Sequence, residues 1–461
     1  MCRERRQRWK IALAGPVVAA LASFGGCGKA PGPPPDVILI MIDTLRPDRL
    51  GCFGYPRNTS PAIDRFAEES LRFENAYSHA PVTRIAVATL VTGFLPHETG
   101  VLERPALPQS VETLAERLRR RGYRTGAVIS NYVLRKGRGY EQGFQIYDDQ
   151  MTDFEEVRKW PERIARHTTD RAIQILEEPG EEPLFLWIVY QDPHGPYTPP
   201  EFFVDEFRQT DAEPRLIPVN ESLSGRGGIP SYQQLGSNRD YDYYAARYDG
   251  EIRYLDLQFQ RLIDALKAQG RYDTALILLT SDHGEGMGEH DYYFAHGEYL
   301  YQNQIHVPLI LRQGRELKGV RHDAVRHIDI ASTILEAADL PPDPRLRGRD
   351  LRQRHGRGGD VFAIMRSPLV EERYQFALVR DGYKLIYTPG HDRYELYDLG
   401  ADPDEQSDLI DSPAHAKRRD ELATALGRFR QEKPLEIGRG EEAPDLIDGE
   451  REKLEALGYL E

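Results

Sequence analysis

The chain has few cysteines, no excess of positive charge and no long apolar run in its body, and each shortage excludes a class of protein. Three cysteines in 461 residues cannot build a disulfide framework. A net charge of −14 at pH 7 argues against nucleic acid or an anionic membrane as the main partner, so an anionic substrate must be held by local cations or a metal. No segment after residue 26 is apolar enough to cross a bilayer. What is present is a globular composition, 40% hydrophobic and 29% charged, without repeats.

The amino terminus has a pattern typical of export. Residues 1–26 hold five basic groups and one acid, and their removal would take the net charge from −14 to −18. Their apolar run, Ile11–Phe24, is too short to span a bilayer and suits a signal-peptide core. Small residues directly before Cys27 resemble a bacterial lipoprotein signal, with residues 27–35 as a proline-rich tether. We therefore expect a lipid-anchored protein on the periplasmic side of a membrane, and an ordinary secretory signal or an uncleaved anchor is the alternative.

Strand and helix signals alternate from residue 36 to about 345. This alternation predicts an α/β fold with a central, mostly parallel sheet sandwiched by helices, which we take as the catalytic domain, 36–345. The predicted strands are 36–43, 124–130, 184–190, 275–280 and 307–312. The predicted helices include Ser60–Glu69, Val111–Arg121 and Arg247–Ala268. Residues 201–240 are polar and rich in Gly, Ser and Pro, so they are expected to form a long surface insertion.

The pattern changes after the proline-rich stretch 341–344. Short alternating runs between 361 and 399 predict a small antiparallel sheet, and a helix near Ala414–Arg430 is expected to cover it. Residues 346–461 are therefore expected to form a smaller C-terminal domain. Its last residues, 449–461, predict a short amphipathic helix that docks onto the body.

Acids and a histidine follow two of the predicted strands. Ser281-Asp282-His283-Gly284-Glu285 comes after the apolar run 275–280, and Asp43 comes after the run 37–42. Chemistry in open α/β sheets collects at the carboxyl edge of the strands, so these side chains outline a metal site. Either segment alone could be a buried strand that ends in a polar loop.

Several motifs occur in an order that resembles the sulfatase family of the alkaline phosphatase superfamily. The resemblance covers roughly residues 36–410. It is carried by Ile42–Tyr55, Thr83–Gly93 with Pro96-His97, Tyr248–Arg253, Ser281–Glu285 with Gly288-Glu289-His290, Leu300-Tyr301 with Val307–Ile310, and Glu395–Leu399 with Asp402-Pro403.

The position of the nucleophile departs from that family. Sulfatases place there a Cys or Ser that is oxidised to formylglycine, followed by Pro and Arg at the second and fourth positions. The matching residues here are Thr83, Ile85 and Val87, and threonine cannot mature to formylglycine. The family's Gly-Lys-Trp-His-Leu stretch corresponds to Ser130–Leu134, without its Lys and His. Thr44 stands where sulfatases carry a second Asp.

These departures make the site similar to that of phosphoethanolamine transferases and lipoteichoic-acid synthases, which use a Thr nucleophile and one metal. Those enzymes carry elements similar to Asp192–Tyr197 and His296–Tyr301, but this chain lacks their membrane helices. The resemblance also implies a helix that begins at the nucleophile. The run Ile85–Val91 is equally good strand material by propensity.

The candidate site residues follow from these motifs. Coordination to a divalent ion would lower the pKa of the Thr83 hydroxyl and make it a nucleophile. Three oxygens and one imidazole favour Zn²⁺ or Mn²⁺, whereas the sulfatase family implies Ca²⁺. The expected metal ligands are Asp43, Thr83, Asp282 and His283. The expected catalytic histidines, which would contact the transferred group or protonate the leaving oxygen, are His194 and His296. The candidate substrate contacts are Asn131 and Arg84. The histidines interpreted as structural or surface residues are His290, His306 and His327.

Three functions fit the sequence. The family predicts a metal-dependent hydrolase of sulfate esters, and the Thr nucleophile predicts a phosphodiesterase or phosphotransferase. The third is a non-catalytic binding protein, which retention of Asp43, Thr83, Asp282 and His283 argues against. The expected partner is a small-molecule or glycan sulfate or phosphate ester, with membrane contact only through the lipid anchor. Neither the natural substrate nor the oligomeric state follows from the sequence.

Overall fold

The computed structural model describes residues 34–432, except 156, 158–159, 209–212, 357 and 367–373. The predicted signal segment 1–26, most of the tether 27–35 and the predicted terminal helix 449–461 lie outside the described residues. Among the described helices, none has the length and apolarity needed to cross a membrane.

The main sheet has the strand order β12-β2-β11-β10-β1-β7-β3-β4, with β13 also paired to β2. The strands β10, β1, β7, β3 and β4 are parallel, whereas β11 runs antiparallel to both of its neighbours. Their bounds are β1 Val37–Ile42, β2 Leu71–Tyr77, β3 Arg124–Val128, β4 Ile146–Asp148, β7 Leu184–Tyr190, β10 Leu276–Ser281, β11 His306–Gln313, β12 Gly319–Arg321 and β13 Val325–Arg326. The predicted fold class and all five predicted strands are confirmed.

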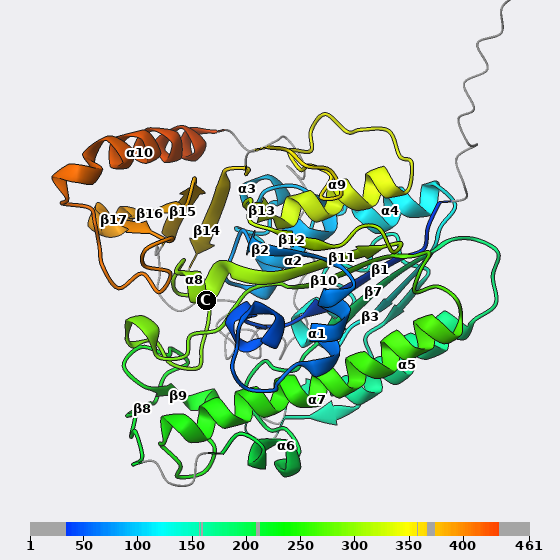
Figure 1. The fold of residues 1–461 in the computed structure, drawn as a ribbon, viewed down its shortest axis with the longest axis horizontal. Coiled ribbons are helices and arrows are strands. Elements are labelled where there is room, and N and C mark those ends of the chain that lie inside the picture. Colours follow the sequence, from blue (N-terminus) through cyan, green and yellow to red (C-terminus); the bar gives the residue numbers. More distant parts are fainter. Residues whose placement is uncertain are drawn as a thin grey trace, which may run out of the picture. The chain divides into compact units, whose positions relative to one another are not determined.

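Helices cover both faces of this sheet (Figure 1). Successive side chains of β1 point to opposite faces, so Val37, Leu39 and Met41 join one core while Ile38, Ile40 and Ile42 join the other. The helices of the first core are α2 Thr83–Thr92, α4 Leu114–Arg120 and α9 His327–Ala337. The helices of the second core are α1 Pro61–Glu68, α5 Ala165–Glu177 and α7 Tyr241–Ala268. Because both faces are covered, β1, β7 and β10 are buried along their whole length.

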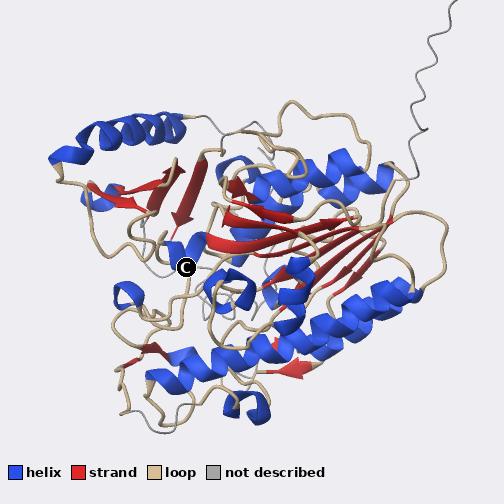
Figure 2. Cartoon of the chain, in the orientation of Figure 1, coloured by secondary structure: helices blue, strands red, loops and turns tan. Residues whose placement is uncertain are grey.

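A second, antiparallel sheet follows in the chain (Figure 2). Its strands are β14 Val361–Arg366, β15 Tyr374–Arg380, β16 Tyr383–Thr388 and β17 Arg393–Asp398. The helix α10, Ala416–Gln431, packs on β15 and β16, as the alternating sequence predicted. The domain boundary expected at residue 345 stays a prediction.

Residues 201–240 are more than a surface insertion. They contain the short elements α6 Glu201–Asp205, β8 Val219–Asn220 and β9 Ile229–Pro230. Ile217 and Ile229 join the second core, and Tyr232 and Gln233 both donate hydrogen bonds to the Phe294 carbonyl at 3.1 Å. The remaining short helices are α3 Pro96–Thr99 and α8 Gln302–Ile305, and the remaining strands are β5 Asp153–Phe154 and β6 Pro161–Glu162.

Candidate metal and active site

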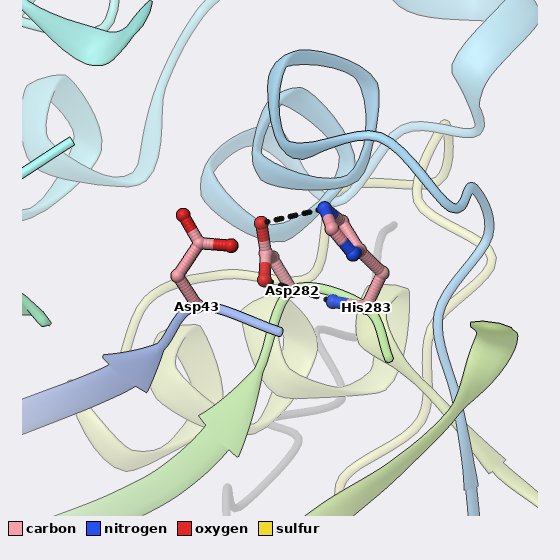
Figure 3. Close-up of side chains that lie close together, drawn as sticks. All are labelled: Asp43, Asp282 and His283. Carbon is pink, nitrogen blue, oxygen red and sulfur yellow. Dashed lines mark hydrogen bonds and ion pairs between the residues drawn. The ribbon is translucent and has the colours of Figure 1, made fainter. Parts of the chain in front are cut away.

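Two parallel strands bring the predicted metal ligands to one edge of the sheet. Ile42 at the end of β1 pairs with Ser281 at the end of β10, so Asp43 and Asp282 leave neighbouring strands at the same level. One ligand atom from each of Asp43, Asp282 and His283 lies within 4.8 Å of the other two (Figure 3). All three side chains are fully buried. The three side chains form a buried group whose ligand atoms could hold a metal ion.

Each carboxylate of this cluster has one oxygen that accepts a hydrogen bond and one that accepts none from the described residues, although Asp282 Oδ2 lies 3.3 Å from His283 Nε2 (Figure 3). Asp43 Oδ2 accepts a 2.5 Å hydrogen bond from the Asn131 amide, and Asp282 Oδ1 accepts from the backbone N–H groups of His283 at 2.9 Å and Thr44 at 3.3 Å. Asp43 Oδ1 and Asp282 Oδ2 are buried and accept no hydrogen bond from any described residue. Buried oxygens without partners are costly unless a cation binds them, so the residues fit a divalent metal.

The electrostatics of the cluster point the same way. Burial raises the pKa of Asp43 well above its ordinary value, the negative charge of Asp282 adds to this rise, and the Asn131 hydrogen bond opposes it. Burial lowers the pKa of His283 to about 4, so its imidazole is neutral. His283 Nδ1 lies 2.9 Å from the Gly284 carbonyl and donates to it, which leaves the Nε2 lone pair for a metal.

Thr83 lies at the first position of α2 and faces this cluster. Its Oγ1 is 3.2 Å from His283 Nε2, and the residue is fully buried. The β-branched run therefore forms a helix, as the resemblance implied. Tertiary packing outweighs the β propensity, because nine of the ten residues of α2 are buried and α2 packs against α9. The helix ends at Gly93, which has φ 78°, and its amino end points its backbone N–H groups toward the site.

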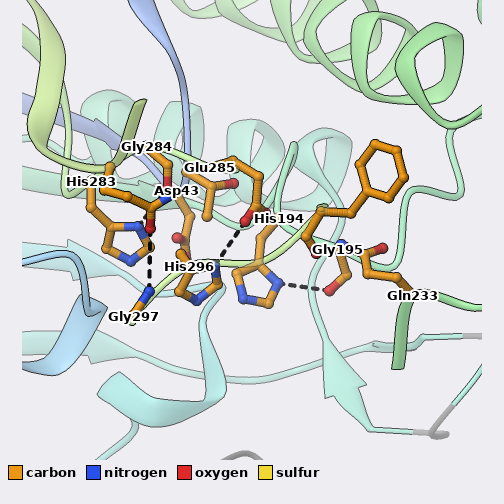
Figure 4. A network of polar contacts seen from close by, with 12 residues as sticks. Asp43, His194, Gly195, Gln233, His283, Gly284, Glu285, His296 and Gly297 are labelled. Carbon is orange, nitrogen blue, oxygen red and sulfur yellow. Dashed lines mark hydrogen bonds and ion pairs between the residues drawn. The ribbon is translucent and has the colours of Figure 1, made fainter. Parts of the chain in front are cut away.

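Both predicted catalytic histidines lie beside the cluster (Figure 4). The His296 ring centroid is 4.5 Å from that of His283 and 5.1 Å from that of His194. His194 Nδ1 donates to the Gly195 carbonyl at 2.7 Å. His296 Nδ1 lies 3.2 Å from a carboxylate oxygen of Glu285, which is fully buried. The three rings form a row that leads from the metal ligands toward the surface.

The 201–240 segment holds the loops that carry these two histidines. Gln233 is fully buried, and its amide donates to the Phe294 carbonyl, two residues before His296. The same amide lies so close to Gly195 that a Cβ added there would overlap it (Figure 4). One side chain of the predicted surface insertion therefore supports both loops.

Two predicted substrate contacts have other partners in the structure. The side-chain amide of Asn131 donates to Asp43 Oδ2 and so orients that carboxylate. The Arg84 guanidinium donates to the backbone carbonyls of Val101 and Arg104. Adjacent side chains on a helix point about 100° apart, so Arg84 faces away from the direction of Thr83.

Two residues near the site, Glu285 and Thr44, were not assigned a role from the sequence, and His327 was interpreted as a structural or surface residue. Glu285 belongs to the same motif as Asp282, yet its partner His296 is eleven positions away. His327, interpreted as structural, is buried at the start of α9, where burial lowers its pKa to about 4 while the charge of Asp282 opposes this. Thr44 has a left-handed backbone, φ 53°, and its buried hydroxyl has no partner among the described residues. A motif position was the only signal available for Glu285 and Thr44.

Known proteins match this chain along most of its length. A family model described as Sulfatase matches residues 35–340, and one described as N-sulphoglucosamine sulphohydrolase, C-terminal, matches residues 288–432. The uncharacterized sulfatase YidJ of Escherichia coli (strain K12) is 26% identical over 443 residues, which cover 85% of this chain and 86% of that protein. An arylsulfatase of Clostridium perfringens (strain 13 / Type A) is 25% identical over 454 residues, which cover 85% and 93%.

Solved structures share the fold at lower identity. One, determined in complex with its substrate D-glucosamine-2-N,6-O-disulfate, has a TM-score of 0.73 at 20% identity and covers 88% of this chain and 100% of that one. The phosphonate monoester hydrolase of Agrobacterium radiobacter has a TM-score of 0.68 at 20% identity and covers 86% and 95%.

Proposed function

The chain belongs to the sulfatase family of hydrolases, and we propose that it cleaves a sulfate or phosphate ester with Thr83 as the nucleophile and one divalent metal. The observation that carries this proposal is the position of Thr83 Oγ1, 3.2 Å from His283 Nε2 in a buried cluster with two carboxylates. A buried hydroxyl that contacts the imidazole of this cluster has no evident structural role. A binding protein without activity would have no need for it.

The residues that would hold the metal are Asp43, Thr83, Asp282 and His283. A bound divalent cation would lower the pKa of the Thr83 hydroxyl and neutralise charge on the anionic group. Two carboxylates and a neutral imidazole favour Zn²⁺ or Mn²⁺, while Ca²⁺ prefers six to eight oxygens. The backbone N–H groups at the start of α2 would add hydrogen bonds to the substrate oxygens.

His296 and His194 would contact the transferred group or protonate the oxygen of the leaving alcohol. Thr83 would lose its hydroxyl proton to solvent, and its Oγ1 would bond to the sulfur or phosphorus atom. The bond to the ester oxygen would break, and that oxygen would take a proton from His296 Nε2. Glu285 accepts from His296 Nδ1 and so turns Nε2 toward the reacting group. Water would then attack the ester of Thr83 and give one proton back to His296 Nε2. The sulfate or phosphate would leave with the water oxygen, and the Thr83 oxygen would take a proton from solvent to restore the hydroxyl.

Two observations bear on the kind of ester. The matching relatives carry sulfatase names, and two of the solved neighbours are phosphonate monoester hydrolases. Thr83 differs from formylglycine because it has a single hydroxyl and cannot expel sulfate by forming an aldehyde. The family favours sulfate esters, whereas the nucleophile favours phosphate esters.

A substrate and metal panel tests the proposal. The full chain is assayed on an aryl sulfate, a phosphate monoester, a phosphodiester and a phosphonate monoester, each with Zn²⁺, Mn²⁺ and Ca²⁺. We expect turnover of at least one ester, abolished by a chelator and restored by one cation. Asp282→Asn should lose bound metal in elemental analysis together with activity. Metal-independent turnover, or full metal content in Asp282→Asn, would refute the metal site.

A further inference from the structure

A cavity of about 640 Å³ leads from the proposed reaction site to the β5–β6 hairpin. Its wall includes His194 at one side and Glu162 of β6 at another. The His194 ring lies 5.1 Å from that of His296, so the cavity adjoins the row of histidines. Trp160 lies two residues before Glu162 in the same hairpin. The alcohol part of a bound ester can therefore enter the cavity and extend toward this tryptophan.

Trp160 forms an aromatic pair with Tyr132. Their ring centroids are 5.6 Å apart, the ring planes meet at 75°, and both residues are partly exposed. Tyr132 begins the short helix η3, Tyr132–Leu134, which packs against α2. It directly follows Asn131, whose amide holds Asp43. The pair therefore joins the cavity wall to the loop that orients an expected metal ligand.

The strand register places Trp160 on the cavity side of the hairpin. Phe154 pairs with Pro161, the residue between Trp160 and Glu162. Paired residues share one face of a hairpin, and the next residue along the strand lies on the other face. Because Glu162 faces the cavity, Trp160 shares its face, whereas Phe154, which is 62% exposed, lies on the opposite face.

Positive charge gathers beside the aromatic pair. The Arg135 guanidinium lies 4.0 Å from the centroid of the Tyr132 ring and donates to the Tyr132 carbonyl at 3.0 Å. The Lys136 side chain is 61% exposed, and its ammonium group is 3.8 Å from Asp149. Residues 132–138 contain three cations and no acid. In a chain of net charge −14, this local excess of positive charge favours an anionic ligand.

We infer that Trp160 and Tyr132 stack a sugar ring of an anionic oligosaccharide, whose esterified ring enters the cavity beside His194. The C–H faces of a pyranose ring are apolar and pack on aromatic rings, while its hydroxyl groups keep their polar partners. Arg135 and Lys136 meet the charged substituents. The inference rests on the proposed function, because it names the alcohol part of the ester.

Intrinsic fluorescence tests the contact without turnover. Of the three tryptophans, Trp187 is fully buried in β7 and Trp9 belongs to the predicted signal segment. A heparin tetrasaccharide added to the full chain should change the emission, and Trp160→Phe should abolish the change. In calorimetric titration, Trp160→Ala should bind the tetrasaccharide about 10-fold more weakly, as for an aromatic anchor of a binding surface. Phe154→Ala, which removes an aromatic ring from the opposite face of the same hairpin, is the control and should keep the affinity.

A neutral sugar of the same length tests the role of charge. Cellotetraose should bind at least about 3-fold more weakly than the heparin tetrasaccharide, and Arg135→Gln should narrow this difference. Thermal melting of each variant checks that it folds. Equal affinity of the native chain for the two tetrasaccharides would overturn the preference for an anionic sugar.

Inhibition of a small ester gives the kinetic form of the test. The heparin tetrasaccharide should compete with a nitrophenyl ester, which is too short to reach Trp160. In Trp160→Ala the inhibition constant should rise about 10-fold while KM for the nitrophenyl ester stays the same. If Trp160 only supports the hairpin, both constants rise together, which would overturn the inference.

The two proposals fail in different ways. Turnover of the nitrophenyl ester without any binding of the tetrasaccharide would refute the sugar-binding surface and leave the proposed function. An emission change that persists in Trp160→Phe would also refute this surface. Binding of the tetrasaccharide at Trp160 without turnover of any ester would support the surface and refute the proposed function alone.

Discussion

Thr83, the proposed nucleophile, has a single hydroxyl, and this would determine how its ester is released. We expect phosphate ester turnover to exceed sulfate ester turnover. A threonine sulfate can be released only by slow hydrolysis with water, whereas formylglycine eliminates sulfate by forming an aldehyde. Thr83→Ala should lower kcat by at least about 10³-fold, and Thr83→Ser should retain part of the activity. High-resolution mass spectrometry of enzyme quenched during turnover should find phosphate on the Thr83 peptide. Efficient sulfate release by Thr83→Ala would contradict this role.

The Glu285–His296 contact gives a second prediction. His296→Ala should lower kcat by about 10²–10⁴-fold on an alkyl ester, which needs a proton on its leaving oxygen. Glu285→Gln should show a smaller loss in kcat with little change in KM. Both losses should shrink on a nitrophenyl ester, because a good leaving group departs without a proton.

Metal content separates this role from a role in metal binding. Elemental analysis should find the same metal in His296→Ala as in the native chain. Loss of the metal, or an equal defect on both esters, would mean that His296 does not protonate the leaving group.

The buried carboxyl of Asp256, which caps the start of α1, should make the stability of the chain depend on pH. Asp256 on α7 accepts hydrogen bonds from the N–H groups of Ala62 and Ile63 at 2.8–3.0 Å, and burial raises its pKa to about 6. Between pH 4 and 6 the folded chain keeps a proton at Asp256 that the unfolded chain has released. Stability therefore falls as the pH rises through this window, by up to about 3 kcal/mol from this group.

Asp256→Asn cannot titrate, so its melting temperature should fall less between pH 4 and 6.5 than that of the native chain. Asp170→Asn removes an acid from an exposed ion pair and serves as the control. Parallel melting curves for the native chain and Asp256→Asn would show that the carboxyl of Asp256 does not titrate in this window.

Elements with a strong apolar pattern were predictable, and elements defined by tertiary contacts were not. β1, β7 and β10 are continuous apolar runs, which buried parallel strands require. β2, Leu71–Tyr77, mixes charged and apolar residues and was missed. α2 was expected only through the family resemblance, since its residues favour a strand by propensity.

The same distinction holds within the site. Asp43, Asp282 and His283 follow directly from the ends of two parallel strands. The contact between Glu285 and His296 depends on a loop that folds back, with the Gly286 N–H donating to the Ala295 carbonyl at 2.8 Å. The position of Arg84 depends on the rotation of α2 about its axis, which no sequence pattern specified.

At the scale of the whole molecule, the small sheet supports the loop that follows His296. Lys384 of β16 and Glu405 are both buried and form an ion pair at 2.9 Å. Glu405 also accepts from the Gln302 N–H at 2.6 Å, at the start of α8. Tyr301 donates to Glu395 of β17 at 3.0 Å. The second sheet therefore fixes residues 301–302, which begin five residues beyond His296.

Removing one partner of the Lys384–Glu405 ion pair should lower both the stability of the chain and its kcat. Lys384→Met leaves the Glu405 charge buried without a partner, which costs about 3–5 kcal/mol. Lys384→Met combined with Glu405→Gln removes both charges and should recover much of that loss, because the amide oxygen can still accept from Gln302. Lys417→Met, at an exposed pair on α10, should cost less than about 1 kcal/mol. Thermal melting and kcat of the three variants measure both effects together. If the single and double variants have the same melting temperature, the Lys384–Glu405 ion pair does not stabilise the loop after His296. The packing of the two sheets alone would then position that loop.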